Sequence, residues 1–230
     1  MPTQASAWHA HATQRIAAGT AGPRSVPTHM EWCTKPGHGP GADLLGTDLG
    51  GNRILELGCG PGHNAAHLAV HQEARVTGVD LVRLQILRAR SHYGPLRNLD
   101  FVAGHALPYL NASEEQFDAI YSVFGAIGLV APQLVLPAIA ERLAPGRVLA
   151  FSVPHPRRGG RSTANDDKPR RDHVTLPDRT RLSIARWELT ADRWTKHLDQ
   201  TGFRLTSTEE HYDSGVCRWP TTLLIRAHKL

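Results

Sequence analysis

The chain has 230 residues, of which 40% are hydrophobic and 20% charged, a size and composition typical of one soluble domain with a full core. No apolar run is long enough to cross a membrane, and Met1 to Trp8 lack the basic start and apolar centre of a secretory signal. The cysteines, Cys33, Cys59 and Cys217, are far apart and form no C-x-x-C pair. These features argue against a membrane span, a disulfide framework and a cysteine zinc site, and they predict a cytoplasmic protein.

The net charge of +5 comes from one segment. Between Pro156 and Arg186 there are nine lysines and arginines and four acidic residues, and the rest of the chain is balanced. A nucleic-acid-binding face would spread its positive charge more widely. We therefore interpret residues 154–188 as a basic insertion, too polar to be core, with a small hairpin over Leu176–Ile184.

Residues 1–52 are expected to form an N-terminal extension. Ala5–Ala18 predicts a helix with a thin apolar pattern, and Gly19–Pro27 predicts a loop. The segment around Trp32 is rich in proline and glycine, which disfavour regular structure. It could fold over a ligand as a lid, or Trp32 could simply fill the core. A short helix over Ala42–Leu45 precedes the first strand.

The stretch Arg53–Gly62 organises the remaining chain, residues 53–230. Ile54–Leu57 is a short apolar run that predicts a buried parallel strand. Glycines at 58, 60 and 62 follow, and then the helix formers of His63–His71. A glycine turn before a helix lets a ligand approach the backbone and the free N–H groups of the helix. A dinucleotide-binding turn would need its third glycine at position 63, which is a histidine.

The pattern E-x-G-x-G-x-G, from Glu56 to Gly62, resembles the first motif of class I S-adenosylmethionine (SAM)-dependent methyltransferases. Asp80 ends the next apolar run, where an acid is suited to accept hydrogen bonds from both ribose hydroxyls. The resemblance implies an α/β fold, a Rossmann-like doubly wound seven-stranded sheet that is mostly parallel with the last strand antiparallel. It also implies SAM as cofactor, with S-adenosylhomocysteine as product.

The resemblance further implies which residues border the cofactor. His105 stands where the family often has an acid near the adenine, and its imidazole could accept from the adenine amine. Phe124 could stabilise the sulfonium by cation–π attraction or be ordinary core. The predicted cofactor residues are Trp32, Glu56, Gly58, Cys59, Gly60, Gly62, Asp80, Leu81, His105, Ala106, Ser122 and Phe124.

Three histidines, His63, His67 and His71, fall at i, i+4 and i+8 on one helix face. This spacing superficially suggests a metal site, but further ligands are not evident nearby. We predict an exposed polar stripe and no metal.

The downstream pattern alternates strands and helices, as a doubly wound sheet requires. The predicted elements are a helix over Leu81–Tyr93, a strand over Leu99–Ala103, a polar connector over Asn111–Gln116, a strand from Phe117, a helix over Leu134–Leu143 that begins or kinks at Pro137, a strand over Val148–Val153, a helix over Ala191–Gln200, and strands over Phe203–Glu209 and Thr221–Ala227.

His155 follows the fifth strand, between Pro154 and Pro156. The carboxyl ends of central strands hold ligands in open α/β sheets, and imidazole titrates near neutral pH. We therefore predict His155 as a candidate general base, with the arginines of the basic insertion as a cover that contacts an acidic acceptor. The alternative is that His155 only hydrogen-bonds the loop and the arginines face water.

The sequence favours methyl transfer to a small molecule, because the positive charge is confined to one segment. Two alternatives remain: an RNA methyltransferase that uses the basic segment to contact phosphates, and a SAM-binding regulator or partner subunit without turnover. The methyl acceptor and the oligomeric state are not identified by the sequence.

Overall fold

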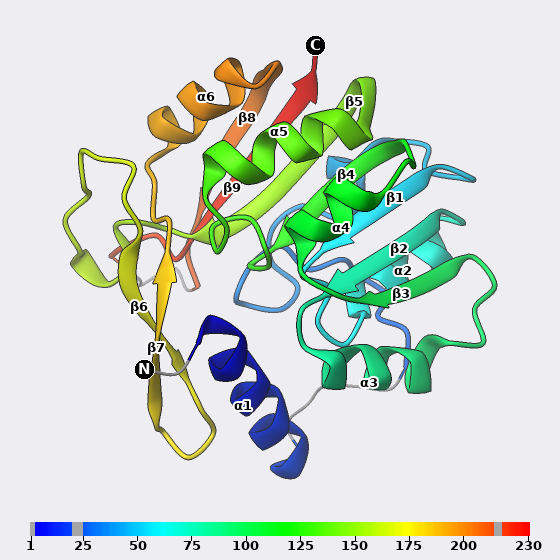
Figure 1. The fold of residues 1–230 in the computed structure, drawn as a ribbon, viewed down its shortest axis with the longest axis horizontal. Coiled ribbons are helices and arrows are strands. Elements are labelled where there is room, and N and C mark those ends of the chain that lie inside the picture. The colour runs from blue at the N-terminus through cyan, green and yellow to red at the C-terminus, as the bar shows by residue number, and fades with distance from the viewer. Residues whose placement is uncertain (1–2, 20–24, 214–217) are drawn as a thin grey trace.

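A computed structural model describes residues 3–19, 25–213 and 218–230, so Cys217 and part of the predicted 19–27 loop lie outside the described residues. The central element is a seven-stranded sheet in the order β3-β2-β1-β4-β5-β9-β8 (Figure 1). Strand β9 runs antiparallel to both of its neighbours, and the pairs among β1 to β5 are parallel. The predicted sheet, mostly parallel with the last strand antiparallel, is confirmed. The strands are β1 (Arg53–Leu57), β2 (Arg75–Asp80), β3 (Leu99–Ala103), β4 (Phe117–Val123), β5 (Leu143–Pro154), β8 (Phe203–His211) and β9 (Thr222–Lys229).

Helices cover both faces of this sheet. One face carries α2 (His63–His71) and α3 (Arg83–Tyr93), and the other carries α4 (Ala106–Ala112), α5 (Pro132–Arg142) and α6 (Ala191–Gln200) (Figure 1). Central strand β1 alternates between the two apolar clusters: Ile54 belongs to the first, and Leu55 and Leu57 to the second. Burial on both faces explains why this strand is apolar at nearly every position.

Several elements differ from the sequence prediction, and strand β5 begins at Leu143 where Val148 was expected. Helix α4 follows His105, which caps it, where no helix was expected. Helix α5 (Pro132–Arg142) begins near the expected start and includes Pro137, but it ends before Leu143, which belongs to β5. The hairpin is longer than predicted, with strands β6 (Arg170–Thr175) and β7 (Arg181–Arg186).

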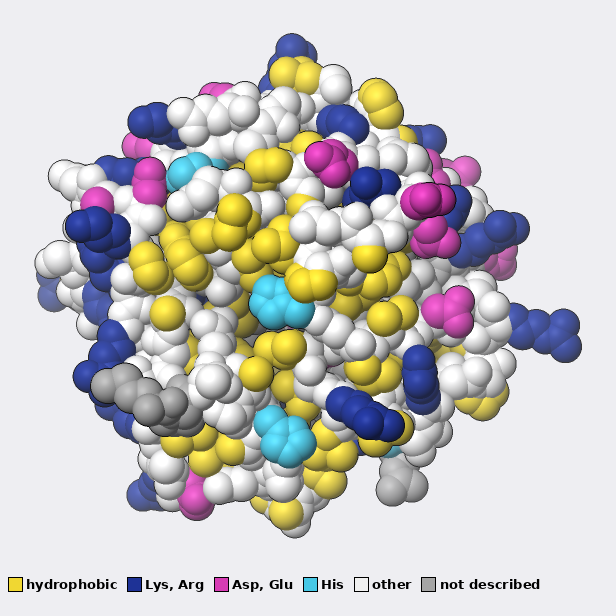
Figure 2. Space-filling view, in the orientation of Figure 1, with side chains coloured by type: hydrophobic (Ala, Val, Ile, Leu, Met, Phe, Trp, Pro, Cys, Tyr) yellow, Lys and Arg dark blue, Asp and Glu magenta, His cyan; other side chains and the backbone are white. Residues whose placement is uncertain are grey.

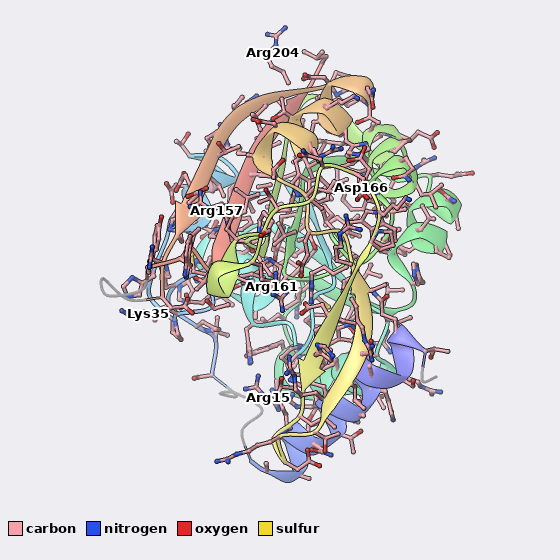
Figure 3. The ribbon with its side chains drawn as sticks, turned by 90° about the vertical axis from the view of Figure 1, so that its left-hand side faces the viewer. Arg15, Lys35, Arg157, Arg161, Asp166 and Arg204 are labelled. Carbon is pink, nitrogen blue, oxygen red and sulfur yellow. The ribbon has the colours of Figure 1, made fainter. Side chains whose placement is uncertain are left out.

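The hairpin and the N-terminal helix α1 (Gln4–Ala17) pack against one another (Figure 3). Ala7 of α1 is buried in a small cluster whose other buried members are Val174, Leu176 and Ile184. The expectation that the basic segment is too polar to contain core was therefore wrong. These side chains are buried because α1 supplies a second apolar surface, which the segment's own composition does not reveal.

The histidines of α2 were also predicted incorrectly in part. His71 is exposed, but His67 is buried and its Nδ1 lies 2.9 Å from the carbonyl oxygen of Pro27. His63 Nδ1 lies 2.7 Å from the hydroxyl of Tyr93. The chain preceding β1 and helix α3 therefore cover this helix face.

The short 3-10 helices are η1 (Ala42–Leu44) and η2 (Arg158–Gly160). Within the described ranges, none of the helices has the length and apolar character needed to span a bilayer.

Candidate functional site

A cavity enclosing about 870 Å³, part of it open to solvent, lies at the carboxyl ends of β1, β2 and β4. This is where open α/β sheets hold their ligands. The predicted residues that line it are Gly58, Gly60, Asp80, Leu81, His105, Ala106 and Phe124. Sequence reasoning did not name the other lining residues, which are Gln4, Trp8 and His11 of α1, Val79, Val82, Gln85 and Gly104, and Gly125, Ala126, Leu129 and Val130 after β4.

Asp80 joins the cavity to the glycine turn. Its Oδ2 accepts a hydrogen bond from the Gly60 N–H at 2.8 Å, and its Oδ1 accepts from the Val82 N–H at 2.7 Å. Burial raises the pKa of Asp80 above its ordinary value, and the two N–H donors oppose that rise. Each carboxylate oxygen has more than one acceptor site. Asp80 can therefore anchor the turn and still accept hydrogen bonds from a ligand's hydroxyls.

Each of the three motif positions requires glycine for a different physical reason. A Cβ at Gly58 would lie 2.6 Å from the Cα of Gly125, so Gly58 allows two loops to touch. A Cβ at Gly62 would lie 2.5 Å from the ring of Phe101. At Gly60 the φ angle is +54°, and a Cβ would meet no protein atom within 4 Å. Gly58 and Gly62 thus permit packing, whereas Gly60 leaves backbone open toward the cavity.

Glu56 and Cys59 lie beneath the glycine turn, away from the cavity wall. Glu56 is 3% exposed, and burial raises its pKa to about 8. Its Oε2 has no hydrogen-bond partner among the described residues. Burial also raises the pKa of the Cys59 thiol. Both were predicted to border the cofactor, but the alternation of β1 turns Glu56 into the core beside Tyr121.

The exit of β4 places an aromatic ring at the cavity. Phe124 has a φ angle of +47°, a left-handed conformation that costs an L-residue about 1–2 kcal/mol. Its N–H donates to the carbonyl oxygen of Ser152 at 2.9 Å, which helps to hold this conformation. Phe124 lines the cavity. Ser122 is fully buried instead, and its hydroxyl donates to the carbonyl oxygen of Leu57 at 2.7 Å.

Of the predicted cofactor residues Trp32 and His105, only His105 lines the cavity. Trp32 is fully buried, its Nε1 donates to the carbonyl oxygen of Gly41 at 3.0 Å, and its ring meets Tyr121 edge-on. Of the two alternatives for Trp32, the structure matches the one in which it fills the core. His105 lines the cavity, and its Nδ1 accepts from the Leu107 N–H at 3.3 Å.

His155 does not line the cavity. Its side chain is buried, with Nδ1 accepting from the Arg157 N–H at 3.0 Å and Nε2 lying 2.9 Å from Glu210 Oε1. Because Nδ1 is an acceptor, Nε2 carries the proton and donates to the carboxylate. Burial lowers the pKa of His155 despite the opposing effect of Glu210. This geometry fits the alternative in which His155 secures its loop, since both nitrogens are already bonded within the chain.

Acidic residues of the chain pair with arginines of the basic insertion. Arg186 Nε donates to Asp172 Oδ2 at 2.9 Å, and both side chains are buried. Arg158 contacts Asp172 at 2.9 Å and also pairs with Glu188, and Arg161 lies 3.1 Å from Glu188. These pairs join the segment after β5 to the hairpin, the region where Figure 3 labels Arg157, Arg161 and Asp166. The arginines of this segment were predicted to contact an acidic acceptor, and three of them, Arg158, Arg161 and Arg186, instead pair with carboxylates of the chain itself.

In the part of the chain that the structure describes, no three His, Cys, Asp or Glu side chains are placed to hold a metal ion. The face shown in Figure 2 has hydrophobic side chains at its centre, and lysines and arginines lie mainly toward its rim.

Comparison with known proteins supports the methyltransferase resemblance. Residues 54–146 match the model of a family described as a methyltransferase domain. Over 168 residues the chain is 29% identical to an O-methyltransferase of Pyrenophora dematioidea, covering 67% of this chain and 55% of that protein. The aligned regions cover between 34% and 55% of the curated relatives. For residues 54–146, the resemblance to class I SAM-dependent methyltransferases is confirmed.

Solved structures show the same fold. An S-adenosylmethionine-dependent methyltransferase from Listeria monocytogenes superposes with a TM-score of 0.65 at 20% identity, covering 82% of this chain and 96% of that chain. The cyclase SpnF superposes with a TM-score of 0.66 at 18% identity, covering 99% of this chain and 97% of that chain. The fold is therefore that of class I SAM-dependent methyltransferases. One fold can host different chemistries, so the reaction has to be argued from the site.

Proposed function

We propose that the protein binds SAM in this cavity and transfers its methyl group to a small molecule. The observation that carries the proposal is the pairing of Asp80 with Gly60. A half-buried carboxylate at the end of β2 faces a cavity in which the backbone at Gly60 is left uncovered. An acceptor of hydroxyl hydrogen bonds beside open backbone fits a ribose joined to a longer ligand.

The cavity residues have distinct roles in this proposal. Bound SAM supplies a methyl group on a positively charged sulfur. Asp80 accepts hydrogen bonds from the ribose hydroxyls, and Leu81 and Ala106 contact the adenine. His105, whose Nδ1 caps helix α4, borders the same end. Phe124 presents its ring to the positive charge, which aromatic faces attract. Methyl displacement needs an in-line approach, so holding both reactants in place contributes much of the rate.

The N-terminal extension, residues 1–52, acts in this proposal as one wall of the site. Helix α1 contributes Gln4, Trp8 and His11 to the cavity lining, although it precedes the matched methyltransferase region. Residues 53–230 form the methyltransferase domain, with 154–188 as an insertion that supports α1. We also propose a cytoplasmic location, because Cys33 and Cys59 are both free thiols, as is usual in a reducing compartment.

Calorimetric titration with SAM tests the proposal. Asp80→Ala removes an ionised acceptor, and hydrogen bonds to charged groups contribute about 1.5–3 kcal/mol, so we expect the SAM dissociation constant to rise at least about tenfold. Asp80→Asn should give a smaller loss, because the amide oxygen can still accept from Gly60. Asp48→Asn is the matched control, since Asp48 lies in an exposed loop before β1 and accepts from the Gly50 N–H.

An affinity that is unchanged by Asp80→Ala would contradict the assignment of Asp80. Incubation with SAM and a metabolite extract, followed by detection of S-adenosylhomocysteine, separates an enzyme from a SAM-binding partner subunit. If SAM binds and no S-adenosylhomocysteine forms with any extract, the proposed turnover is wrong.

A further inference from the structure

One wall of the cavity belongs to α1, a helix outside the matched methyltransferase region. Gln4, Trp8 and His11 are spaced so that they share one face of the helix. The Gln4 side-chain amide donates to the carbonyl oxygen of Leu129 at 3.3 Å, which ties α1 to the loop after β4. Toward its other end, Gln14 donates to Asp178 Oδ2 at 2.9 Å, at the turn of the hairpin. The helix is therefore held against the cavity from two directions.

Besides Asp80, the cavity lining includes a group of residues that carry no charge at neutral pH. They are Gln4, Trp8 and His11 of α1 and, after β4, the segment Phe124–Ala126 with Leu129 and Val130. None of these side chains is acidic, and none is a lysine or arginine. A mostly apolar and aromatic wall with few polar atoms favours an uncharged, flat organic molecule.

Trp8 carries an unused hydrogen-bond donor. Its Nε1 is buried and has no hydrogen-bond partner among the described residues. A buried N–H without a partner is unfavourable, and buried tryptophans normally bond this group. The Trp8 side chain lines the cavity, so a small rotation of its ring would bring this N–H within reach of an oxygen atom of a bound molecule.

His11 stands beside that donor. Its ring centroid lies 5.7 Å from that of Trp8, with the two ring planes nearly perpendicular at 88°. The two rings are therefore in edge-to-face contact. Burial and then the charge of Arg15, one turn along α1 in Figure 3, lower the pKa of His11 below its ordinary value. A neutral imidazole keeps one nitrogen lone pair that can accept a proton.

We propose that Trp8 and His11 form the acceptor end of the cavity and bind a small, uncharged phenol or enol, with His11 as the general base. This inference rests on the proposed methyltransferase function. The acceptor's hydroxyl donates to His11, and its oxygen accepts from Trp8 Nε1–H. As the oxygen–carbon bond forms, the carbon–sulfur bond breaks, its electron pair stays on sulfur, and the hydroxyl proton moves to His11 and then to water.

Charged and titratable groups near His11 set its pH response. Arg15 lies on the same helix, Arg88 on α3 is coupled to Arg15, and Asp80 and His105 line the same cavity. Arg15 favours the neutral imidazole. Base catalysis by His11 should therefore persist to slightly acidic pH, where an unperturbed histidine would be protonated.

The test uses 4-nitrophenol as a probe, because its phenolate absorbs visible light and the neutral phenol does not. The full-length protein is saturated with S-adenosylhomocysteine, and the absorbance of bound probe is followed against pH. We expect the bound probe to ionise at lower pH than free probe in the wild type. In His11→Asn this shift should disappear. His9→Asn, on an exposed position of the same helix, should behave like the wild type.

Trp8→Phe keeps the ring and removes the N–H donor. Loss of one hydrogen bond should raise the probe's dissociation constant about three- to tenfold, with SAM affinity unchanged. With SAM in place of the product, single-turnover formation of 4-nitroanisole should fall by about 10²-fold or more in His11→Asn, as expected for loss of a general base.

The experiment distinguishes failure of the acceptor-end proposal from failure of the proposed function. If S-adenosylhomocysteine binds through Asp80 but the probe does not bind, or ionises equally in the wild type and His11→Asn, the acceptor-end proposal is overturned and the proposed function stands. If neither SAM nor S-adenosylhomocysteine binds the wild type, the proposed function fails and this inference fails with it.

Discussion

Replacing Gly58 by alanine probes the contact between the turns after β1 and β4. An added Cβ would lie 2.6 Å from the Cα of Gly125 and 2.8 Å from the backbone nitrogen of Ala126. Both neighbours are backbone atoms, so the clash cannot be relieved by rotating a side chain. The φ angle of Gly58 is also +83°, which L-residues rarely adopt.

The two effects can be separated with Gly202. Gly202 has a φ angle of +81°, and a Cβ there would meet no atom within 4 Å. Gly202→Ala should therefore show only the backbone strain, about 1–2 kcal/mol. Gly58→Ala carries the same strain and, in addition, a displacement of two packed loops, which should cost about 1–3 kcal/mol more.

Urea denaturation and thermal unfolding without ligand measure this difference. For a chain of this size, about 2 kcal/mol between the variants corresponds to a melting temperature roughly 4–8 °C lower for Gly58→Ala than for Gly202→Ala. Equal unfolding free energies for the two variants would refute the reasoning, because they would show that the loops separate without loss.

Three further changes test other parts of the structure. The folded-state pKa of Glu56, about 8, is above its ordinary 4.5, so the native state holds a proton that the unfolded chain loses. The free energy of unfolding should therefore fall as pH rises from about 4.5 to about 8. Urea titrations at several pH values should show this fall in the wild type and a flatter profile in Glu56→Gln. Asp172→Asn leaves the buried Arg186 cation without its carboxylate partner and should lower the free energy of unfolding by about 3–5 kcal/mol. The double variant with Arg186→Leu should recover part of this loss. If the denaturation midpoint of the double variant shows no recovery, the result argues against a buried ion pair. His155→Gln should reduce kcat by less than about tenfold, not by the 10²–10⁴ typical of a general base, because both ring nitrogens already bond within the chain, to the Arg157 N–H and to Glu210. A larger loss of kcat with normal SAM affinity would restore the prediction that His155 is a general base.

The sequence was most informative where function depends on neighbours along the chain. The turn at Gly58 and Gly60 follows directly from β1, and Asp80 ends the next strand. In parallel strands joined by helices, successive carboxyl ends meet at one edge of the sheet. Strand periodicity and glycine spacing therefore predicted both the fold and the core of the cavity, because each is a local consequence of the backbone.

Side-chain direction at the same motif was harder to predict. Glu56 and Cys59, which the sequence predicts to border the cofactor, are buried and do not line the cavity. The alternation of side chains along β1 sends Glu56 toward Tyr121, and the position of Tyr121 depends on how β4 pairs with β1. That pairing joins residues 65 positions apart and leaves no local signal at Glu56.

The glycine motif and the alternation of elements by themselves predicted a doubly wound sheet with a ligand site at its strand ends. Only the tertiary structure showed that α1 lines this cavity through Trp8 and His11, and that His155 does not line it. The physical reason is the range of the forces involved. Backbone sterics and hydrogen bonds act between near neighbours and follow from local sequence, whereas burial of Ala7 against the hairpin depends on surfaces that meet only after the chain has folded.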